Sequence, residues 1–293
     1  MPYNIQVQIP DVIVKDIEKK IIAELDKMGI FYRIFSRVKS SESTLKKLNE
    51  KNYTNDRKMQ DLLGIRIVLY FNDDIDICEK TVSNIFEKVD EVIDRPNSST
   101  FKPTRTNIVY RLDKTTTENI EYAIYDKYID NTFELQLRTV FSEGWHEVEH
   151  DLRYKCSNEW DSYDDQHRTL NGLVATLETC DWAIMKLFSD LAYLNYKDDN
   201  IVPMLRNKFR IRFINTPLDS SLESMLKKDS FLTKEIFRVD REALLKKLSE
   251  TMISIPLTFN NIVYISNYYF IRNKELNDLM PKTLKDYLFT LDK

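Results

Sequence analysis

The order of apolar and polar residues predicts a mixture of helices and strands in the first half of the chain. Apolar residues recur every three or four positions in some stretches, as in helices, and alternate with polar residues or run together in others, as in strands. The predicted helices are residues 11–28, 40–50, 73–88 and 140–155, and the predicted strands are residues 31–39, 64–71, 89–93, 107–112, 121–128 and 133–138. The pattern predicts an α/β or α+β domain with a mixed sheet.

After about residue 164 the pattern becomes helical. One long helix is predicted over residues 170–194, with its Leu, Trp and Phe side chains on the inner side, and a later one over residues 241–252. We therefore expect two domains, residues 1–197 and 198–293, the second of which is helical.

The stretch from Phe133 to Lys155 begins as a strand and continues as a helix. Alternation places Glu134, Gln136 and Arg138 on one face of the strand. An acid, an amide and a guanidinium on one face are costly to bury, so this face is expected to be solvated or to bind a polar ligand. The helical part is predicted to pack through one side, formed by Phe141, Trp145, Val148 and Leu152.

The composition is that of a soluble globular protein, with 42% hydrophobic and 31% charged residues. The net charge of -4 argues against a generally basic nucleic-acid binder, but the charge is unevenly distributed. Residues 31–60 and 201–293 each carry about +5, and residues 61–200 carry about -13. A basic segment beside an acidic one suits a phosphate-rich ligand that is held partly through a divalent cation.

Cysteine usage and hydropathy indicate a cytoplasmic protein. The three cysteines (Cys78, Cys156 and Cys180) are odd in number and widely spaced, which argues against disulfides and a thiolate zinc site. The N-terminus lacks the pattern of a signal peptide. The longest uncharged stretch, residues 251–270, contains Pro256 and several polar residues, so no membrane association is expected.

A group of basic and hydroxyl residues is a candidate polyphosphate site. Arg37 and Lys39 lie two apart on a predicted strand, and Ser43 and Lys47 lie four apart on the next helix, so each pair shares a face. The start of that helix adds free N–H groups that bind anions. The alternative interpretation is an ordinary solvated charged surface.

A carboxylate stands at the start of the clearest predicted strand. Asp61 precedes residues 64–71, from which Arg66 projects. Magnesium sites commonly combine one or two carboxylates with phosphate oxygens, so Asp61 is a candidate ligand. The alternative is a carboxylate in a turn.

His146-Glu-Val-Glu-His150 matches the short pattern of zinc peptidases. On a helix both histidines would share a face, and Glu147 would serve as the general base. The longer pattern fails because position 156 is Cys, although Glu159 or Glu178 remains open as a third ligand. A zinc peptidase is the remote alternative.

Three separated motifs together resemble the synthetase domain of the RelA/SpoT-type alarmone synthetases, which make (p)ppGpp. They are residues 37–47 (RVKSSESTLKK), residues 61–68 (DLLGIRIV) with residues 73–75 (DDI), and residues 134–139 (ELQLRT) with Trp145, Glu149-His150 and Tyr154-Lys155. The resemblance covers about residues 10–190. It accounts for the zinc pattern as a Trp and a Glu-His pair beside which His146 stands by chance.

The resemblance implies a nucleotidyltransferase-like mixed β-sheet flanked by helices and an ATP-binding site. Carried over by position, Arg37 and Arg66 would sandwich the adenine ring. The phosphate groups would contact Lys39, Ser43 and Lys47.

The resemblance also implies transfer of the β,γ-pyrophosphate of ATP to a ribose hydroxyl. Asp61 and Glu134 would hold Mg²⁺, and Glu134 would also take the proton from the acceptor hydroxyl. Gln136 and Arg138 would support that site. Transfer of this kind depends on charge neutralisation and in-line positioning, which these residue types supply.

The acceptor side departs from the family pattern. The family has Lys-x-x-Gly-Tyr-x-Ser-x-His between the second and third motifs, and its Tyr stacks on guanine, but the four glycines here stand at positions 29, 64, 144 and 172. Phe101 or Tyr110 is a candidate stacking face, and Lys102 or Arg105 a candidate phosphate contact, against an ordinary loop and strand start. The acceptor is thus left open between a guanine nucleotide (GTP or GDP) and another such as the tRNA 3′ end.

The main alternative to an ATP-dependent pyrophosphokinase is a non-catalytic nucleotide sensor. The presence of both Asp61 and Glu134 argues against a sensor, since binding alone has less need of a base. For residues 198–293 inhibition of the synthetase, binding of a regulator and oligomerisation all stay open. The lack of a His-Asp hydrolase pattern argues against a second, hydrolytic activity.

Overall fold

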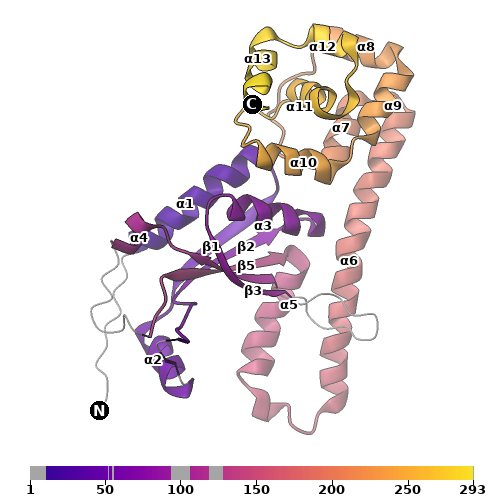
Figure 1. Cartoon of the computed structure of the whole chain (residues 1–293). Coiled ribbons are helices and arrows are strands. Elements are labelled where there is room, and N and C mark those ends of the chain that lie inside the picture. The colour runs from indigo at the N-terminus through magenta and orange to yellow at the C-terminus, as the bar shows by residue number, and fades with distance from the viewer. Residues whose placement is uncertain (1–10, 52, 55, 94–105, 119–127, 293) are drawn as a thin grey trace. The chain divides into compact units, whose positions relative to one another are not determined.

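The computed structural model describes residues 11–51, 53–54, 56–93, 106–118 and 128–292 (Figure 1). The chain divides into two compact units, residues 1–22, 32–75 and 82–181 in the first and residues 23–31, 76–81 and 182–293 in the second. The division falls within three helices, α1 (Asp11–Met28), α3 (Ile75–Ser83) and α6 (Asp164–Lys197). A boundary between domains after Lys197 stays a prediction.

The first unit contains a mixed five-stranded sheet in the order β1-β2-β5-β4-β3. Strands β2 and β5 pair in parallel, and the other pairs are antiparallel. The mixed sheet expected from the sequence is confirmed. The strands are β1 (Tyr32–Val38), β2 (Leu63–Leu69), β3 (Lys88–Ile93), β4 (Thr106–Arg111) and β5 (Thr132–Thr139). The helical elements of this unit, besides those shared with the second, are α2 (Ser41–Glu50), 3₁₀ turns at Asn72–Asp74 and Ser157–Glu159, α4 (Lys114–Glu118), α5 (Val140–Glu149) and a π-helical turn at His150–Tyr154.

The two faces of the sheet differ because side chains alternate along each strand. One face is apolar and almost fully buried, and it carries Ile65, Ile67, Ile108, Tyr110, Phe133, Leu135 and Leu137. The other carries Arg37, Arg66, Asn107, Glu134, Gln136 and Arg138, which the strand registers bring into neighbouring rows.

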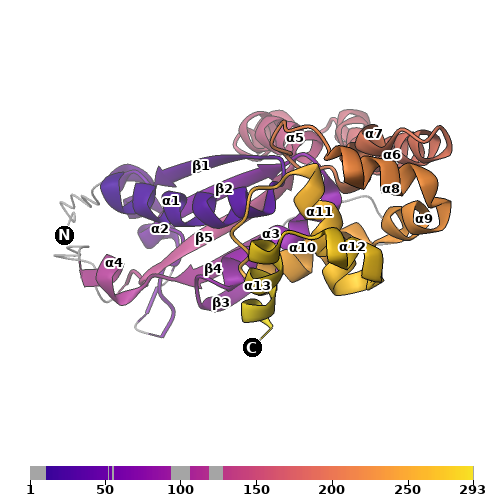
Figure 2. The same ribbon diagram turned by 90° about the horizontal axis from the view of Figure 1, so that it is seen from above.

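Helices cover both faces. Ser36 of β1 projects to the apolar face and donates a hydrogen bond to Glu18 of α1, so α1 packs on that face (Figure 2). Its stripe of Ile13, Ile17 and Ile21 is buried. Helix α5 lies over the polar face, since its carboxylates bind Arg66.

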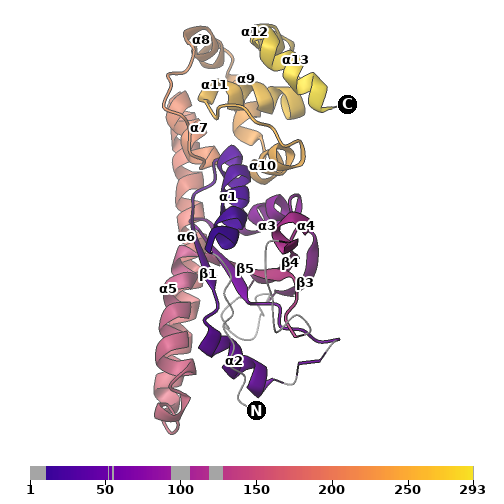
Figure 3. The same cartoon turned by 90° about the vertical axis from the view of Figure 1, so that its left-hand side faces the viewer.

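The first part of α6 packs against α5 (Figure 3). Trp145 is buried and its indole Nε1 donates to the carbonyl oxygen of Leu170 at 3.1 Å. The predicted inner side of this stretch is only partly correct, because Val148 and Leu152 are 48% and 61% exposed. Trp182 of α6 is likewise 59% exposed, although it was expected on the inner side. Helical periodicity identifies an apolar stripe but not whether another element covers it.

Other boundaries differ from the pattern-based ones. The helix predicted at residues 73–88 is a 3₁₀ turn at Asn72–Asp74 followed by α3, which ends at Ser83. Phe86, beyond that end, is buried and contacts Phe133, with ring centroids 5.0 Å apart. The long helix begins earlier, at Asp164, and α5 gives way to the π-helical turn at His150. The strand predicted at residues 121–128 lies almost wholly outside the described residues.

The second unit is helical, as expected. Side chains that cap helix N-termini mark where its helices begin: Asp219, Asp229, Asp240, Thr258 and Asn273 each accept a backbone N–H. Its helical elements beyond α6 are α7 (Ile201–Phe209), α8 (Ser220–Lys228), α9 (Ser230–Arg238), α10 (Arg241–Glu250), α11 (Phe259–Ser266), a π-helical turn at Asn267–Ile271, α12 (Lys274–Leu279) and α13 (Lys282–Leu291).

Gly29→Ala is expected to destabilise the second unit. Gly29 has φ +65°, and a Cβ added there would collide with Cδ1 of the buried Leu257. The left-handed conformation and the displaced leucine together cost about 2 kcal/mol of unfolding free energy. Urea denaturation measures the change. Gly172→Ala in α6 is the matched control, because an added Cβ there meets nothing within 4 Å, and it should stabilise the protein by about 0.5–1 kcal/mol. Equal effects of the two substitutions would contradict the prediction.

A buried acid links α6 to the start of α5. Thr139 caps α5, accepting from Ser142 N at 3.1 Å, and its hydroxyl donates to Oδ2 of Asp181 at 2.8 Å. Burial raises the pKa of Asp181 to about 6, although the hydrogen bond from Thr139 acts in the opposite direction.

Because of Asp181, the free energy of unfolding is expected to decrease as the pH rises from about 4 to about 6. The folded state binds the proton more tightly than the unfolded state, so the folding advantage is present at low pH and is lost as the pH rises through the folded pKa. The charged form then costs up to about 3 kcal/mol at neutral pH. Asp181→Asn should remove this slope and stabilise the protein at pH 7.5, as judged by urea denaturation across the range. Asp198→Asn, at an exposed position, should leave the slope unchanged. An unaltered slope in Asp181→Asn would rule the mechanism out.

Among the described residues no helix is long and apolar enough to span a membrane. Cys78 is buried, Cys156 and Cys180 are partly exposed, and all three are free thiols.

Candidate active site

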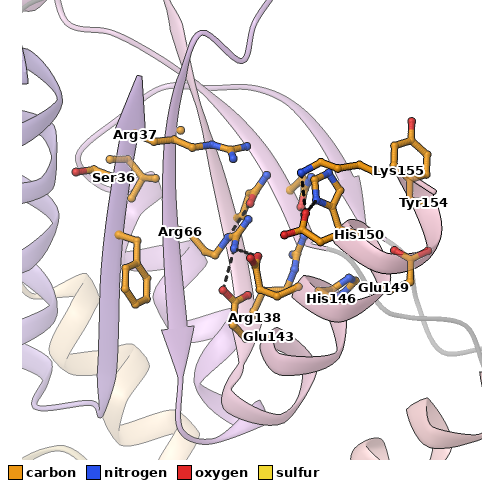
Figure 4. Close-up of a pocket in the computed structure, with 17 residues that line it drawn as sticks. Ser36, Arg37, Arg66, Arg138, Glu143, His146, Glu149, His150, Tyr154 and Lys155 are labelled. Carbon is orange, nitrogen blue, oxygen red and sulfur yellow. Dashed lines mark hydrogen bonds and ion pairs between the residues drawn. The ribbon is translucent and has the colours of Figure 1, made fainter. Parts of the chain in front are cut away.

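A cavity of about 730 Å³ lies over the polar face of the sheet, between the strands and α5 (Figure 4). The strands contribute four of the predicted site residues, namely Arg37, Arg66, Gln136 and Arg138. The helical side contributes Glu143, His146, Glu147, Glu149, His150, Asp151, Tyr154 and Lys155. The cavity walls thus carry both charges, with guanidinium groups on the sheet and mostly carboxylates on the helix.

Arg66 occupies the centre of the cavity and is held by three side chains (Figure 4). Its Nε donates to Oε1 of Gln136 at 3.0 Å, and its NH1 donates to Oε1 of Glu143 at 2.9 Å and to Glu147. Burial lowers the pKa of Arg66, but Glu143 and Glu147 together raise it by more, so the pKa is above its ordinary value. These contacts fix the plane of the guanidinium, and a fixed plane can stack on a ring.

Arg37 extends into the same cavity from the neighbouring strand (Figure 4). It pairs with Gly64 in the β1–β2 register, and a Cβ built on Gly64 would lie 3.5 Å from Arg37 Cγ and Nε. Glycine therefore leaves space beside the Arg37 side chain. Arg37 and Arg66 thus lie on one face of the sheet, and the adenine sandwich that the resemblance implies for them stays a prediction.

The predicted phosphate-binding lysines surround Asp61 in a separate cluster. Lys39 Nζ donates to Asp61 Oδ2 at 2.6 Å, and Lys47 donates to the same oxygen. Burial raises the pKa of Asp61, but the two ammonium groups lower it more, so the net shift is downward. The pKa of Lys39 is lowered by burial, whereas that of Lys47 is raised, since Asp61 outweighs its burial.

Ser43 lies in the first turn of α2, the helix that also carries Lys47. Ser40 is the N-cap and accepts from Ser43 N at 3.2 Å, and the two hydroxyls lie 2.9 Å apart. Ser43 is exposed. The helix start and its hydroxyls form a suitable surface for an anion.

Glu134 is partly buried on β5 and accepts two hydrogen bonds from amides. Asn107 Nδ2 donates to Oε1 at 3.1 Å, and Gln136 Nε2 donates to Oε2 at 2.8 Å. Arg138 NH2 in turn donates to Asn107 Oδ1 at 2.9 Å. Both donors are neutral, and within the described part of the chain Glu134 forms no salt bridge, so its carboxylate stays available as a base or a ligand.

Asp61 and Glu134 come from neighbouring parallel strands. Asp61 lies two residues before β2, whose Leu63 and Gly64 pair with Phe133 and Glu134. The second oxygen of Asp61, Oδ1, is buried and has no hydrogen-bond partner within the described residues. A buried carboxylate oxygen without a donor suits a cation, so the residues present fit Mg²⁺, which needs only one or two carboxylates beside phosphate oxygens.

The zinc pattern does not form a closed ligand set in the described part of the chain, where no group of three or more His, Cys, Asp or Glu side chains is arranged to hold a metal. His150 is engaged with Asp151, at 2.9 Å between Nδ1 and Oδ1, and its ring stacks on Tyr154. Glu147, the predicted zinc-site base, binds Arg66 instead. The pattern therefore contributes to the wall of the cavity.

The prediction of an acceptor contact from Tyr110 is wrong. Tyr110 belongs to the apolar face, is fully buried, hydrogen-bonds Ser83 at 2.9 Å and stacks on Phe133, with centroids 5.6 Å apart. The alternating pattern put Asn107 rather than Tyr110 on the cavity side. Phe101, Lys102 and Arg105 lie outside the described residues.

Two cavity residues had no assigned role in the sequence. Asn107 was the first residue of a predicted strand, and its contact with Glu134 depends on the β4–β5 register. Glu143 was one polar position on a predicted helix, and its contact with Arg66 depends on α5 lying over β2. Neither relation leaves a local sequence signal.

A known protein family matches part of the chain. The family described as "Region found in RelA / SpoT proteins" matches residues 36–159. All the site residues described above lie within this range. The resemblance predicted from the three motifs is therefore confirmed for this part of the chain.

Solved structures similar to this one include small alarmone synthetases. Small alarmone synthetase 1 from Bacillus subtilis, bound to its product pppGpp, is 22% identical, with 62% of this chain and 94% of that chain covered and a TM-score of 0.47. Small alarmone synthetase 2 from Bacillus subtilis is 21% identical, with coverages of 60% and 93% and a TM-score of 0.42. A GTP pyrophosphokinase family protein from Streptococcus pneumoniae is 19% identical, with coverages of 60% and 89% and a TM-score of 0.40. No curated protein sequence matches the chain significantly.

Proposed function

We propose that this GTP pyrophosphokinase-like chain, with its RelA/SpoT region at residues 36–159, transfers the β,γ-pyrophosphate of ATP to a ribose hydroxyl of a guanine nucleotide. The observation that carries the proposal is the polar face of the sheet. Glu134, whose carboxylate forms no salt bridge within the described residues, lies there in the rows that also hold Arg66 and Arg37. Proton abstraction and the binding of a nucleotide are thereby combined on one surface.

ATP would bind through its base and its phosphates at different places. The adenine ring would stack on the guanidinium of Arg66, whose plane Gln136, Glu143 and Glu147 fix, with Arg37 on its other side. The phosphate chain would extend toward Lys39 and Lys47 and the start of α2. Asp61 holds these two ammonium groups together in the free protein, which keeps them ready for an anion.

Mg²⁺ would be held by Asp61 and Glu134, and when bound it would neutralise charge on the phosphate oxygens. The buried oxygen of Asp61 without a hydrogen-bond partner supports this assignment. Glu134 would exchange the weak amide donors of Asn107 and Gln136 for the ligand, while Arg138 keeps Asn107 in position.

The reaction forms one bond and breaks one. Glu134 accepts the proton of the ribose hydroxyl, and that oxygen bonds to the β-phosphorus of ATP. The bond between the β-phosphorus and the oxygen bridging to the α-phosphate breaks, and AMP leaves. The lysines and arginines of the two clusters stabilise the negative charge on the phosphate oxygens during this step.

Incubation with γ-labelled ATP and Mg²⁺ tests the proposal, with GDP, GTP, other nucleotides and bulk tRNA offered separately. We expect label on GDP or GTP and one AMP for each label transferred. Label on tRNA alone would overturn the choice of acceptor. ADP in place of AMP would overturn pyrophosphate transfer. ATP binding without AMP formation, for any acceptor, would favour the non-catalytic sensor.

A further inference from the structure

A second cavity, of about 620 Å³, lies in the helical unit between α10 and the end of the chain, and we propose that it binds a nucleoside monophosphate. Its lining comes from α10, from the π-helical turn that follows α11, from Arg272 directly after that turn and from the residue after α13. It consists of Ala243, Lys246, Lys247, Glu250, Tyr269, Phe270, Arg272 and Asp292. None of these residues belongs to the RelA/SpoT region or to the proposed transfer site.

The cations of the cavity lie against aromatic rings. Lys247 Nζ is 4.8 Å from the centroid of the Tyr269 ring, and Arg272 Cζ is 5.3 Å from that of Tyr268. Lys246, which also pairs with Glu242 of α10, adds a third positive charge to the lining. An ammonium and a guanidinium held in this way present N–H donors to an anion, of which phosphate is the one that matches them best.

The aromatic side chains provide a face for a base. Phe270 lines the cavity and is 40% exposed, so part of its ring is accessible to a ligand. Burial, together with Asp292 and Tyr268, raises the pKa of Tyr269 to about 12, so the ring stays neutral at physiological pH. Neutral rings beside cations are the combination that binds a nucleobase and its phosphate.

The backbone that carries these residues is rigid and strained. The turn Asn267–Ile271 is π-helical, a form that is frequent at functional sites. It ends at Arg272, which has φ 64° although it is not glycine. Asn267, which is 1% exposed, holds this conformation: its carbonyl accepts from Arg272 N at 2.8 Å, and its side chain exchanges two hydrogen bonds with the backbone of Asn273. A strained segment that is clamped this firmly presents Phe270 and Arg272 in one arrangement.

Two carboxylates in the lining favour a ligand that carries hydrogen-bond donors and only one phosphate group. Glu250 and Asp292 line the cavity, and Asp292 accepts from Tyr268 Oη at 2.8 Å. They reduce the net charge of the lining to about +1, which disfavours a polyphosphate or a nucleic-acid backbone. They also offer acceptors for ribose hydroxyls or a base amino group. A nucleoside monophosphate has all the matching parts.

Equilibrium dialysis of the full chain with labelled AMP, and separately with labelled GMP, tests the proposal. Lys247→Gln and Arg272→Gln should each weaken binding at the second cavity by about tenfold, the loss that one charge-assisted hydrogen bond explains. Phe270→Leu keeps an apolar side chain but removes the stacking face, and should weaken binding without lowering the melting temperature. Lys227→Gln in α8 is the control for loss of an exposed lysine, and should bind as the wild type does.

All four variants should retain the wild-type rate of transfer from ATP, because they lie outside the proposed transfer site. If the three cavity variants bind AMP and GMP as tightly as the wild type does, the proposal is overturned. Binding of a short oligoribonucleotide in place of either mononucleotide would overturn the choice of ligand. If the wild type transfers no label but the cavity variants still lose nucleotide, the proposed function fails and this site stands.

Discussion

Glu134→Gln is expected to lower the rate of pyrophosphate transfer by about a thousandfold, a loss within the range for a general base. The substitution keeps the size and shape of the side chain. Its amide oxygen keeps one of the two hydrogen bonds, from Asn107 or from Gln136, while its NH2 group cannot accept and loses the other. What it removes is the negative charge that accepts the proton and contributes to Mg²⁺ binding. Affinity for ATP measured without Mg²⁺ should stay within about twofold of the wild-type value, since the adenine and lysine contacts remain.

Single-turnover transfer from labelled ATP, with AMP quantified in parallel, measures this effect. Glu87→Gln is a matched control, because Glu87 is an exposed carboxylate that pairs with Arg111 outside the cavity. It should transfer at the wild-type rate. Undiminished transfer by Glu134→Gln would show that another group takes the proton. Loss of ATP binding together with transfer would show that Glu134 acts on the nucleotide site as a whole.

The polar face of the sheet could be predicted because it depends on a local property. Alternation along one strand put Glu134, Gln136 and Arg138 on the same side. Arg37 and Arg66 share this side because of the β1–β2 pairing, which alternation within a strand does not determine. Adjacent strands then only had to pair in register, as they do. Lys39 and Lys47 converge on one position, but the sequence did not reveal that Asp61 fills it in the free protein, and phosphate binding by the two lysines stays a prediction.

The contacts that complete the site depend on packing between distant segments. From its sequence neighbours, Glu147 was interpreted as a base next to two histidines. In the fold it binds Arg66 instead, because α5 lies over β2. Asn107 became a partner of Glu134 only through the β4–β5 register. Tyr110 was misassigned for the same reason: whether its strand side faces the cavity or the core depends on that register.

Asp61→Asn is expected to separate phosphate binding from catalysis. In the free protein the Asp61 carboxylate neutralises Lys39 and Lys47, and all three side chains are only 15–26% exposed. Without this charge the two ammonium groups repel one another, and unfolding should become easier by about 2 kcal/mol, less than the loss for a fully buried pair because some solvent reaches the cluster. The same repulsion makes the free site more cationic. Tripolyphosphate without Mg²⁺ should therefore bind more tightly, and it should restore much of the lost stability.

Transfer that depends on Mg²⁺ should move in the opposite direction. The amide cannot replace the carboxylate oxygen that is proposed to bind the cation, so turnover should fall by about a hundredfold and require more Mg²⁺. Thermal denaturation with and without tripolyphosphate, and transfer rates over a Mg²⁺ titration, measure the two effects. Asp113→Asn is the control for loss of an acid–lysine pair. Asp113 Oδ2 lies 2.7 Å from Lys20 Nζ, and neither residue lines the cavity. It should change neither tripolyphosphate affinity nor the Mg²⁺ requirement. Tighter tripolyphosphate binding with undiminished transfer would confine Asp61 to holding the lysines and would leave Mg²⁺ to Glu134 alone.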